Sequence, residues 1–387
     1  MFPRILLFSL MLFSSCITVA QKNSQEKDIN HFILNKISNY KIPGFAACIV
    51  ARDSIKWKAA FGYEDVKNKK LFNTKTVINI ASVSKTFVGF AIMIAVDKEL
   101  IGLDDDINAY IHEYQIKNPD ISLKQNITVR NLATHTSGII DRNEVYMKTY
   151  TDINNSKEKL SDFLSEYLAP SGSSYSKDNF IPYKPGAYYQ YSNIGAALAA
   201  EVLSRAAKMS FNDFCNKYIF QPLKMNGTGW FLADVKLMTH SKLYSENMQE
   251  IPLYNIITYP DGGLRTNMDD LSKFLIMVIN HGKFKGKRII SSSGFDEMIK
   301  PQFNSLTAPY NIDTALFNQG IFWHIDKNSK IGALIGHTGG DPGVTSYMYF
   351  SPLYSVGVIM IINKSLTAQE NVCIKDILTK LWEFAFN

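Results

Sequence analysis

The chain has 387 residues, of which 46% are hydrophobic, 12% aromatic and 20% charged, and its formal net charge is +6 at pH 7. This apolar content suffices for a large core, in one large domain or two closely packed domains. It argues against a disordered or fibrous protein. Because no long run of like charge concentrates the excess of basic residues, nucleic-acid binding is not indicated.

Residues 1–20 are predicted to be an export signal. Arg4 supplies the basic start, an apolar stretch covers residues 5–13, and small residues end at Ala20. No later stretch approaches the ~20 apolar residues of a membrane span. We therefore expect a periplasmic or secreted chain. In an alternative interpretation, Cys16 is a lipid-attachment site that tethers the protein to a membrane.

Hydrophobic patterning predicts strands at both ends of the chain and helices between them. Residues 44–52 and 54–63 have the pattern of a hairpin, and residues 82–99 that of a buried helix. The remaining predicted elements are helices at 160–167, 194–207, 269–280 and 371–386, a polar loop at 171–185, and strands at 320–326, 331–337, 344–350 and 356–363.

This order predicts an α+β fold, an antiparallel β-sheet flanked by helices with a mainly helical subdomain. We assign the sheet subdomain to residues 21–81 and 315–387, and the helical subdomain to residues 82–314. A cleft is expected between them.

The first candidate for chemistry is the sequence Ser82-Val83-Ser84-Lys85. Residues three apart on a helix are neighbours, so an amine lies beside a hydroxyl. A lysine kept neutral by burial accepts the proton of a serine nucleophile. The same spacing also begins at Ser24, Ser38, Ser156 and Ser174. Unlike these four serines, Ser82 lies where a loop enters a strongly apolar helix. In the alternative interpretation, Ser82 only caps this helix and Lys85 extends to solvent.

The second candidate is Tyr191-Ser192-Asn193, at the start of a helix rich in small residues. A phenol relays a proton to a leaving group, and a carboxamide orients a lysine or holds a substrate amide. The structural alternative makes Tyr191 an amphipathic core residue and Asn193 a helix cap.

The third candidate is His337-Thr338-Gly339-Gly340, at the end of an apolar strand. A strand edge offers unpaired backbone N–H groups, and glycines allow a substrate to approach the backbone closely. His337 would supply a hydrogen bond or a positive charge for a substrate carboxylate. The alternative is a turn between strands with a surface histidine.

Together, the ordered Ser-x-x-Lys, Tyr-x-Asn and His-Thr-Gly elements resemble the active-site motifs of serine β-lactamases and D-alanyl-D-alanine peptidases, and most closely those of class C β-lactamases and D-Ala-D-Ala carboxypeptidases. Further segments extend the resemblance over residues 29–385: Asn131 to Gly138, Gln221 to Met225 and Asp261 to Thr266.

The resemblance implies that Ser82 is the nucleophile, with Lys85, alone or with Tyr191, accepting its proton. Tyr191 then protonates the leaving group, and Asn193 holds Lys85 and the substrate amide. The backbone N–H groups of Ser82 and Gly340 form the oxyanion hole, while His337, Thr338 and Gly339 complete the substrate-binding strand.

Two departures bear on the substrate. His337 stands where many β-lactamases of this family have lysine, which argues against potent antibiotic hydrolysis. No glutamate-bearing loop of the class A type is recognisable, so deacylation would use Tyr191 or the substrate. The expected substrates are D-amino-acid peptides of the cell wall, followed by β-lactams, small esters and other amides. The alternatives are an esterase or amidase of the same fold, and a binding protein that senses wall peptides or penicillin without turnover.

No metal or cofactor is expected. The sequence Asp104-Asp105-Asp106 begins like a calcium loop, but Ala109 and Gln115 stand where glycine and glutamate are required. Helix capping explains the acidic run better. His135, in the sequence Thr-His-Thr-Ser-Gly, is predicted to be structural.

Overall fold

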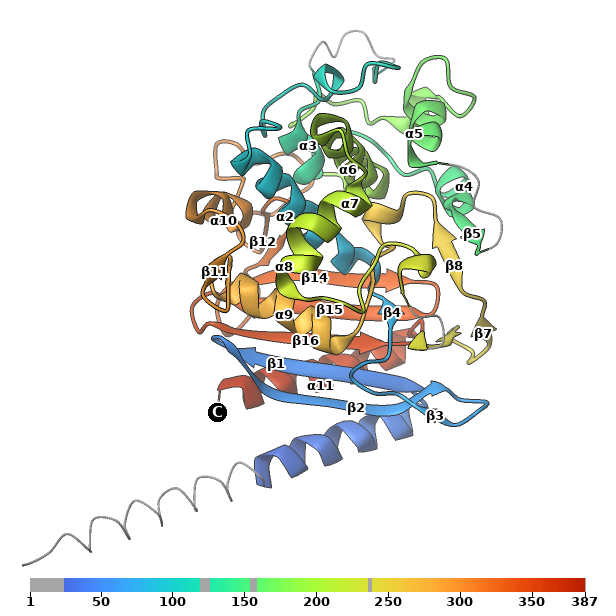
Figure 1. Ribbon diagram of the computed structural model, residues 1–387, viewed down its shortest axis with the longest axis vertical. Coiled ribbons are helices and arrows are strands. Elements are labelled where there is room, and N and C mark those ends of the chain that lie inside the picture. The colour runs from blue at the N-terminus through green and yellow to red at the C-terminus, as the bar shows by residue number, and fades with distance from the viewer. Residues whose placement is uncertain (1–23, 119–125, 154–158, 236–238, 387) are drawn as a thin grey trace, which may run out of the picture.

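The computed structural model describes residues 24–118, 126–153, 159–235 and 239–386. Its centre is an eight-stranded sheet with the strand order β12-β13-β14-β15-β16-β1-β2-β3, in which every neighbouring pair is antiparallel (Figure 1). The predicted fold class, an antiparallel sheet flanked by helices, is confirmed. The strands are β1 (Gly44–Ala51), β2 (Ser54–Asp65), β3 (Lys70–Leu71), β12 (Phe317–Gln319), β13 (His324–Asp326), β14 (Leu334–Asp341), β15 (Val344–Ser351) and β16 (Val356–Ile362).

The two ends of the chain meet in this sheet. Strand β1 pairs with β16 from Phe45 opposite Ile362 to Ala51 opposite Val356. Seven of the eight residues of β1 and all seven of β16 are buried, as expected for central strands covered on both faces. The predicted hairpin is present, since β1 also pairs with β2.

Helices cover both faces of the sheet, and alternate residues of the strands face one layer or the other. The helix over residues 24–39 and α11 (Ala368–Phe386) pack on one face, where Phe45 and Val358 contribute to the core. The opposite face, with Cys48 and Ile359, packs against α2 (Ser84–Asp97) and α9 (Met268–Ile279).

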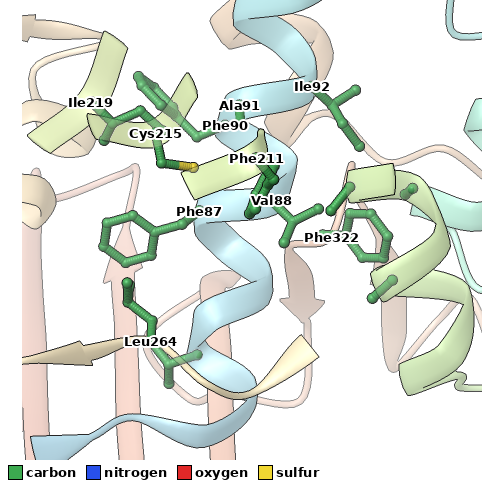
Figure 2. Packing of buried hydrophobic residues seen from close by; sticks show 14 of the residues in the cluster. Phe87, Val88, Phe90, Ala91, Ile92, Phe211, Cys215, Ile219, Leu264 and Phe322 are labelled. Atoms are coloured by element: carbon green, nitrogen blue, oxygen red, sulfur yellow. The ribbon is translucent and has the colours of Figure 1, made fainter. Parts of the chain in front are cut away.

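Helix α2 is apolar all round because it is surrounded by other elements. Its residues from Ser84 to Ala95 are all buried. Figure 2 shows its side chains between Phe211 and Cys215 of the neighbouring helix and Phe322 from the loop between β12 and β13. Phe87 stacks on Phe274 of α9, with ring centroids 3.8 Å apart. The predicted buried helix is confirmed, although its first turn is the separate 3-10 turn η1 (Ala81–Val83).

The region between β3 and β12 is mainly helical in its described residues. Its α-helices are α2, α3 (Val129–Ala133), α4 (Asn143–Tyr146), α5 (Leu160–Leu168), α6 (Asn193–Ala207), α7 (Phe211–Cys215), α8 (Gln221–Leu223), α9 and α10 (Ser292–Ile299). Its short strands are β4 (Ile78–Asn79), β5 (Tyr150–Asp152), β6 (Leu243–Tyr244), β7 (Glu250–Ile251), β8 (Tyr254–Ile256), β9 (Arg265–Thr266), β10 (Lys283–Phe284) and β11 (Lys287–Arg288).

Two predicted strands differ from the structure. The strand expected at 320–326 is interrupted, because Phe322 adopts a φ of 58° and turns the chain between β12 and β13. The strand expected at 331–337 is β14, which begins at Leu334 and continues to Asp341, since its pairing with β15 runs to the end of the hairpin. His337 therefore lies inside a strand and not in a turn.

The acidic run 104–106 behaves as a cap, because the Asp106 carboxylate accepts a hydrogen bond from the backbone N–H of Asn108. In the described residues no group of three acidic, cysteine or histidine side chains is arranged to hold a metal ion. Likewise, none of the described helices is long and apolar enough to cross a membrane. The predicted export signal and Cys16 lie outside the described residues.

Candidate active site

Ser82 lies in η1, and Lys85 lies in the first turn of α2. The Lys85 amine is 3.0 Å from the Ser82 hydroxyl. Ala81, directly before the serine, has a φ of 48°, a left-handed conformation that is costly for a residue with a side chain. This turn presents Ser82 at the surface of the helix while Lys85 is 0% exposed.

The amine of Lys85 has three partners. Besides Ser82, it is 2.6 Å from the Asn193 carboxamide oxygen and 2.6 Å from the Asp261 carbonyl oxygen. Burial lowers the pKa of Lys85, although Asp261, Asp341 and Asp141 oppose this shift. In its neutral form the amine has two N–H donors and one lone pair, which would allow it to donate to the two carbonyl oxygens and accept the proton of Ser82.

Tyr191 completes this chain of hydrogen bonds. Its hydroxyl donates to the Ser82 oxygen at 2.9 Å. Burial raises the pKa of Tyr191 well above its usual range, with a smaller opposing effect from the bond to Ser82. The phenol is therefore protonated in the resting site. This makes Tyr191 a proton donor at the start of a reaction, and leaves Lys85 as the acceptor.

Helix α6 begins at Asn193 and holds the second motif in place. Ser192 is its N-cap, and the Ser192 hydroxyl accepts from the backbone N–H of Gly195. The Asp141 carboxylate accepts from the Ser192 hydroxyl and from the backbone N–H groups of Asn193 and Ile194, at 2.9, 2.6 and 3.0 Å. The carboxylate thus fixes the helix end that carries Asn193.

The third motif lies beside Ser82. Ser346 of β15 donates to the Ile80 carbonyl at 2.6 Å. A Cβ on Gly339 would be 2.5 Å from the same oxygen, so only glycine allows β14 to lie this close to η1. Because β13 pairs only with residues Leu334 to Gly336, the following residues of β14 leave one strand edge open. Thr338 and Gly340 are exposed there.

His337 is 1% exposed, and its ring stacks on His324 with centroids 3.8 Å apart. Its Nδ1 donates to the Thr338 carbonyl, so its Nε2, which has no partner among the described residues, carries a lone pair. Burial lowers the pKa of His337 well below its usual range, with smaller contributions from His324 and Lys85. Of the two contributions that the sequence suggested for His337, a hydrogen bond or a positive charge, this environment favours the hydrogen bond.

This geometry agrees with the result of comparison with known proteins. The family model described as Beta-lactamase matches residues 22–376. The chain belongs to the Beta-lactamase family.

Several relatives and a solved structure are similar to this member of the Beta-lactamase family. "Protein flp" of Staphylococcus aureus (strain MRSA252) is 20% identical over 347 residues, which cover 88% of this chain and 63% of that protein. "Penicillin-binding protein 4*" of Bacillus subtilis (strain 168) is 23% identical over 308 residues, 76% of this chain and 62% of that protein. The chain thus spans less than two thirds of these curated relatives.

The octameric penicillin-binding protein homologue from Pyrococcus abyssi has a TM-score of 0.67 and 23% sequence identity, and the match covers 87% of this chain and 73% of that one. At this identity, the similarity shows that the two proteins share a fold.

Sequence reasoning missed several residues around this Beta-lactamase-family site. Asp141, Asp261, Asp341 and His324 lie near Lys85 or Tyr191, where Asp261 is buried and the other three are half-buried. Each belongs to or follows closely on a segment already singled out, such as Asp341 directly after Gly340. His135, for which the sequence favours a structural role, is buried: its Nδ1 accepts from the Ser192 N–H, and its ring centroid is 4.4 Å from that of Tyr191. These residues can be recognised as part of the site only from their proximity to Lys85 and Tyr191 in the folded structure.

Proposed function

We propose that the protein is a serine hydrolase that forms and hydrolyses an acyl-enzyme at Ser82, acting on amide or ester bonds. Membership of the Beta-lactamase family, a family of serine hydrolases, supports this proposal. The observation that carries it is the continuous chain of hydrogen bonds from the Tyr191 hydroxyl through Ser82 to the buried Lys85 amine.

In the first half-reaction, the Ser82 oxygen bonds to the substrate carbonyl carbon while its proton passes to Lys85. Following the family resemblance, the backbone N–H groups of Ser82 and Gly340 hold the negative oxygen. Collapse of this intermediate breaks the bond to the leaving group, which takes the proton of Tyr191. Lys85, whose amine is 5.0 Å from the Tyr191 ring centre, returns its proton to the phenolate.

In the second half-reaction, a water molecule replaces the leaving group. Its proton passes to the Tyr191 and Lys85 pair, its oxygen bonds to the acyl carbon, and the bond to Ser82 breaks as Ser82 regains a proton. The products are a carboxylic acid and the amine or alcohol released earlier. We propose D-amino-acid peptides of the cell-wall type as substrates, followed by β-lactams and small esters, and we propose that the chain is exported.

The test is to incubate the protein with a neutral alkyl fluorophosphonate and with a reactive penicillin, and to locate the adduct by mass spectrometry. We expect modification of Ser82 and its loss in Ser82→Ala. Ser84→Ala is the matched control, because the Ser84 hydroxyl accepts from the Leu264 N–H and not from Lys85. Modification elsewhere, or unchanged labelling of Ser82→Ala, would refute the proposal.

A turnover screen then identifies the substrate. D-Ala-D-Ala peptides, a chromogenic cephalosporin and short-chain esters are compared under the same conditions. Labelling of Ser82 without turnover of any ester, amide or lactam would favour a sensor over a hydrolase.

A further inference from the structure

One end of the central sheet carries an exposed surface that is rich in basic residues. The β1–β2 turn, the β15–β16 turn and the hairpin of β10 and β11 meet at this end, which lies at the left of Figure 1. The backbone N–H of Arg52 donates to the Ser355 carbonyl at 2.8 Å, and the carboxamide of Asn280, just before β10, donates to the Arg52 carbonyl at 2.9 Å. These two hydrogen bonds join the three connections into one surface.

A groove of about 1020 Å³ crosses this surface, and most of its charge is positive. Lys58 and Lys273, which line it, pair with Asp269 and Asp270. The other titratable residues of its lining are Asp53, His281, Arg52, Lys283, Lys285 and Arg288. Among the described residues, no carboxylate lies within 4 Å of a nitrogen of the last four. The groove therefore presents four exposed cations without an ion partner against one acid, which gives it a positive potential.

The hairpin of β10 and β11 concentrates this charge. Four of the six residues from Lys283 to Arg288 are basic, and all four are exposed. Arg288 is held in place, since its guanidinium donates to the carbonyl oxygens of His281 and Ile290 at 3.0 and 3.1 Å. Lys285, at the tip, has a φ of 47°, a conformation that favours glycine. The hairpin thus carries a charge at a turn position where an uncharged glycine would be less costly.

Exposed apolar side chains adjoin these cations. Leu353 is 72% exposed and Tyr354 is 49% exposed, and they directly precede Ser355, which lines the groove. Tyr354 is held against Phe386, with ring centroids 4.7 Å apart. Cations beside an exposed leucine and tyrosine are typical of surfaces that bind at a membrane interface, where the cations attract anionic headgroups and the apolar groups enter the headgroup region. A soluble polyanion would require only the cations.

We propose that this end of the sheet docks the protein on the surface of a membrane that is rich in anionic phospholipids. The groove receives the phosphate headgroups, and the side chains of the β15–β16 turn enter the interface. The docking surface consists of Arg52, Lys283, Lys285, Lys287, Arg288, Leu353 and Tyr354.

The docking surface is well separated from the candidate active site. On β15, Thr345 lies opposite Gly340, whereas Ser351 lies opposite Val356, which pairs with Ala51 at the β1–β2 turn. Because a strand advances about 3.3 Å per residue, the docking surface lies about 20 Å from Gly340. A docked protein therefore holds its active site away from the bilayer, and the docking does not depend on the chemistry at Ser82.

The experiment measures how the full chain partitions onto vesicles of phosphatidylcholine alone and onto vesicles that also contain about 30% phosphatidylglycerol. The ratio of the two partition coefficients cancels contributions from any part of the chain that binds lipid regardless of its charge. We expect a preference for the anionic vesicles of about 30-fold or more at about 0.1 M salt, because each cation near an anionic surface contributes about 5-fold. The preference should be lost at about 0.5 M salt, which screens these charges.

Lys283→Gln/Lys285→Gln should lower this preference about 10-fold or more. The matched control is Lys67→Gln/Lys69→Gln, which removes two exposed cations from the β2–β3 hairpin at the other end of the sheet. Lys69 has a φ of 52°, so the control also matches the left-handed conformation of Lys285. The control should change the preference less than 3-fold, and thermal melting verifies the folding of both variants.

A second pair of variants distinguishes a membrane from a soluble polyanion. Leu353→Ser should lower partition onto the anionic vesicles about 5-fold or more, because a leucine that enters the interface leaves water. It should leave the binding of long-chain polyphosphate unchanged. Leu71→Ser, at a leucine of β3 that is 66% exposed, is the control and should change neither.

Equal partition of the wild type onto both kinds of vesicle, or equal effects of the two lysine pairs, would overturn the inference. Unchanged vesicle partition of Leu353→Ser, with tight binding of polyphosphate, would assign the surface to a soluble polyanion and would also overturn membrane docking. Failure of fluorophosphonate to modify Ser82 would refute the proposed function and leave this inference standing.

Discussion

Lys85 illustrates how the site is set at the scale of single residues. Its three neighbours, Ser82, Asn193 and the Asp261 carbonyl, match the two donors and one lone pair of a neutral amine. Its full burial favours that neutral form. The same burial that is costly for a charged lysine therefore prepares it to accept a proton.

Replacing Asn193 should disturb this arrangement. In Asn193→Ala, the Lys85 amine loses one acceptor and its fixed direction, and we expect Ser82 to be acylated about 10- to 100-fold more slowly. The measurement is the rate of fluorophosphonate labelling, with thermal melting to verify folding. Asn35→Ala, on the exposed side of the helix over residues 24–39, should label at the wild-type rate. Unchanged labelling of Asn193→Ala would contradict the role given to the carboxamide.

The carboxylates of Asp261 and Asp341 should make stability depend on pH. Burial raises the pKa of Asp261 to about 7 and that of Asp341 to about 6, against about 3.9 in an unfolded chain. Between pH 4 and 7 the folded state therefore binds more protons than the unfolded state, so the free energy of unfolding should fall as the pH rises.

Asp341→Asn removes one of these groups and keeps an oxygen for Tyr150. We expect its free energy of unfolding to drop less between pH 4 and 8 than that of the wild type, by about 1–3 kcal/mol. Denaturant titrations at both pH values measure this difference. An equal drop in the free energy of unfolding of the two proteins would show that Asp341 has the same pKa in the folded and unfolded states.

At the scale of elements, the close approach of β14 to η1 decides where the open strand edge lies. A Cβ on Gly339 would lie 2.3 Å from the Ser346 hydroxyl and 2.5 Å from the Ile80 carbonyl, whereas one on Gly340 would meet nothing within 4 Å. Gly339→Ala should therefore cost about 1–3 kcal/mol of stability and slow acylation of Ser82. The free energy of unfolding of Gly340→Ala should lie within about 0.5 kcal/mol of the wild-type value. Equal free energies of unfolding for the two variants would contradict this packing.

The capping of α6 is a second element-scale feature. Asp141→Ala removes the acceptor for two backbone N–H groups and the Ser192 hydroxyl, so we expect a loss of about 1–2 kcal/mol and at least 10-fold slower acylation. Asp213→Ala, in the first turn of α7, removes an exposed capping acid and should leave acylation unchanged. If Asp141→Ala destabilised the protein without slowing acylation, Asp141 would support the helix but not the site.

At the scale of the whole molecule, the two ends of the chain are joined in one sheet between helical layers, so the core should unfold cooperatively. Cys48, Cys215 and Cys373 are all free and buried, in the sheet, in α7 and in α11. We expect these thiols to react with a disulfide reagent only in denaturant, at the same midpoint as the loss of circular dichroism. Peptide mapping distinguishes them from Cys16. Reaction of one thiol well before the others would reveal a separately unfolding part.

The sequence by itself determined the local elements and the reacting groups. An apolar run long enough for a helix predicted α2. β-compatible residues on either side of a short polar turn predicted β1 and β2, and the spacing of Ser82 and Lys85 requires only one helical turn. These features depend on neighbours in the chain, so they can be inferred from it.

Tertiary structure decided the rest, because burial and charge depend on residues far away in sequence. Burial, with a smaller effect from His324, lowers the pKa of His337, and burial raises the pKa of Asp341. No local pattern distinguishes a surface histidine from a buried one at the end of a strand. The chain therefore encodes the reacting groups locally, whereas their protonation depends on the packing of distant segments.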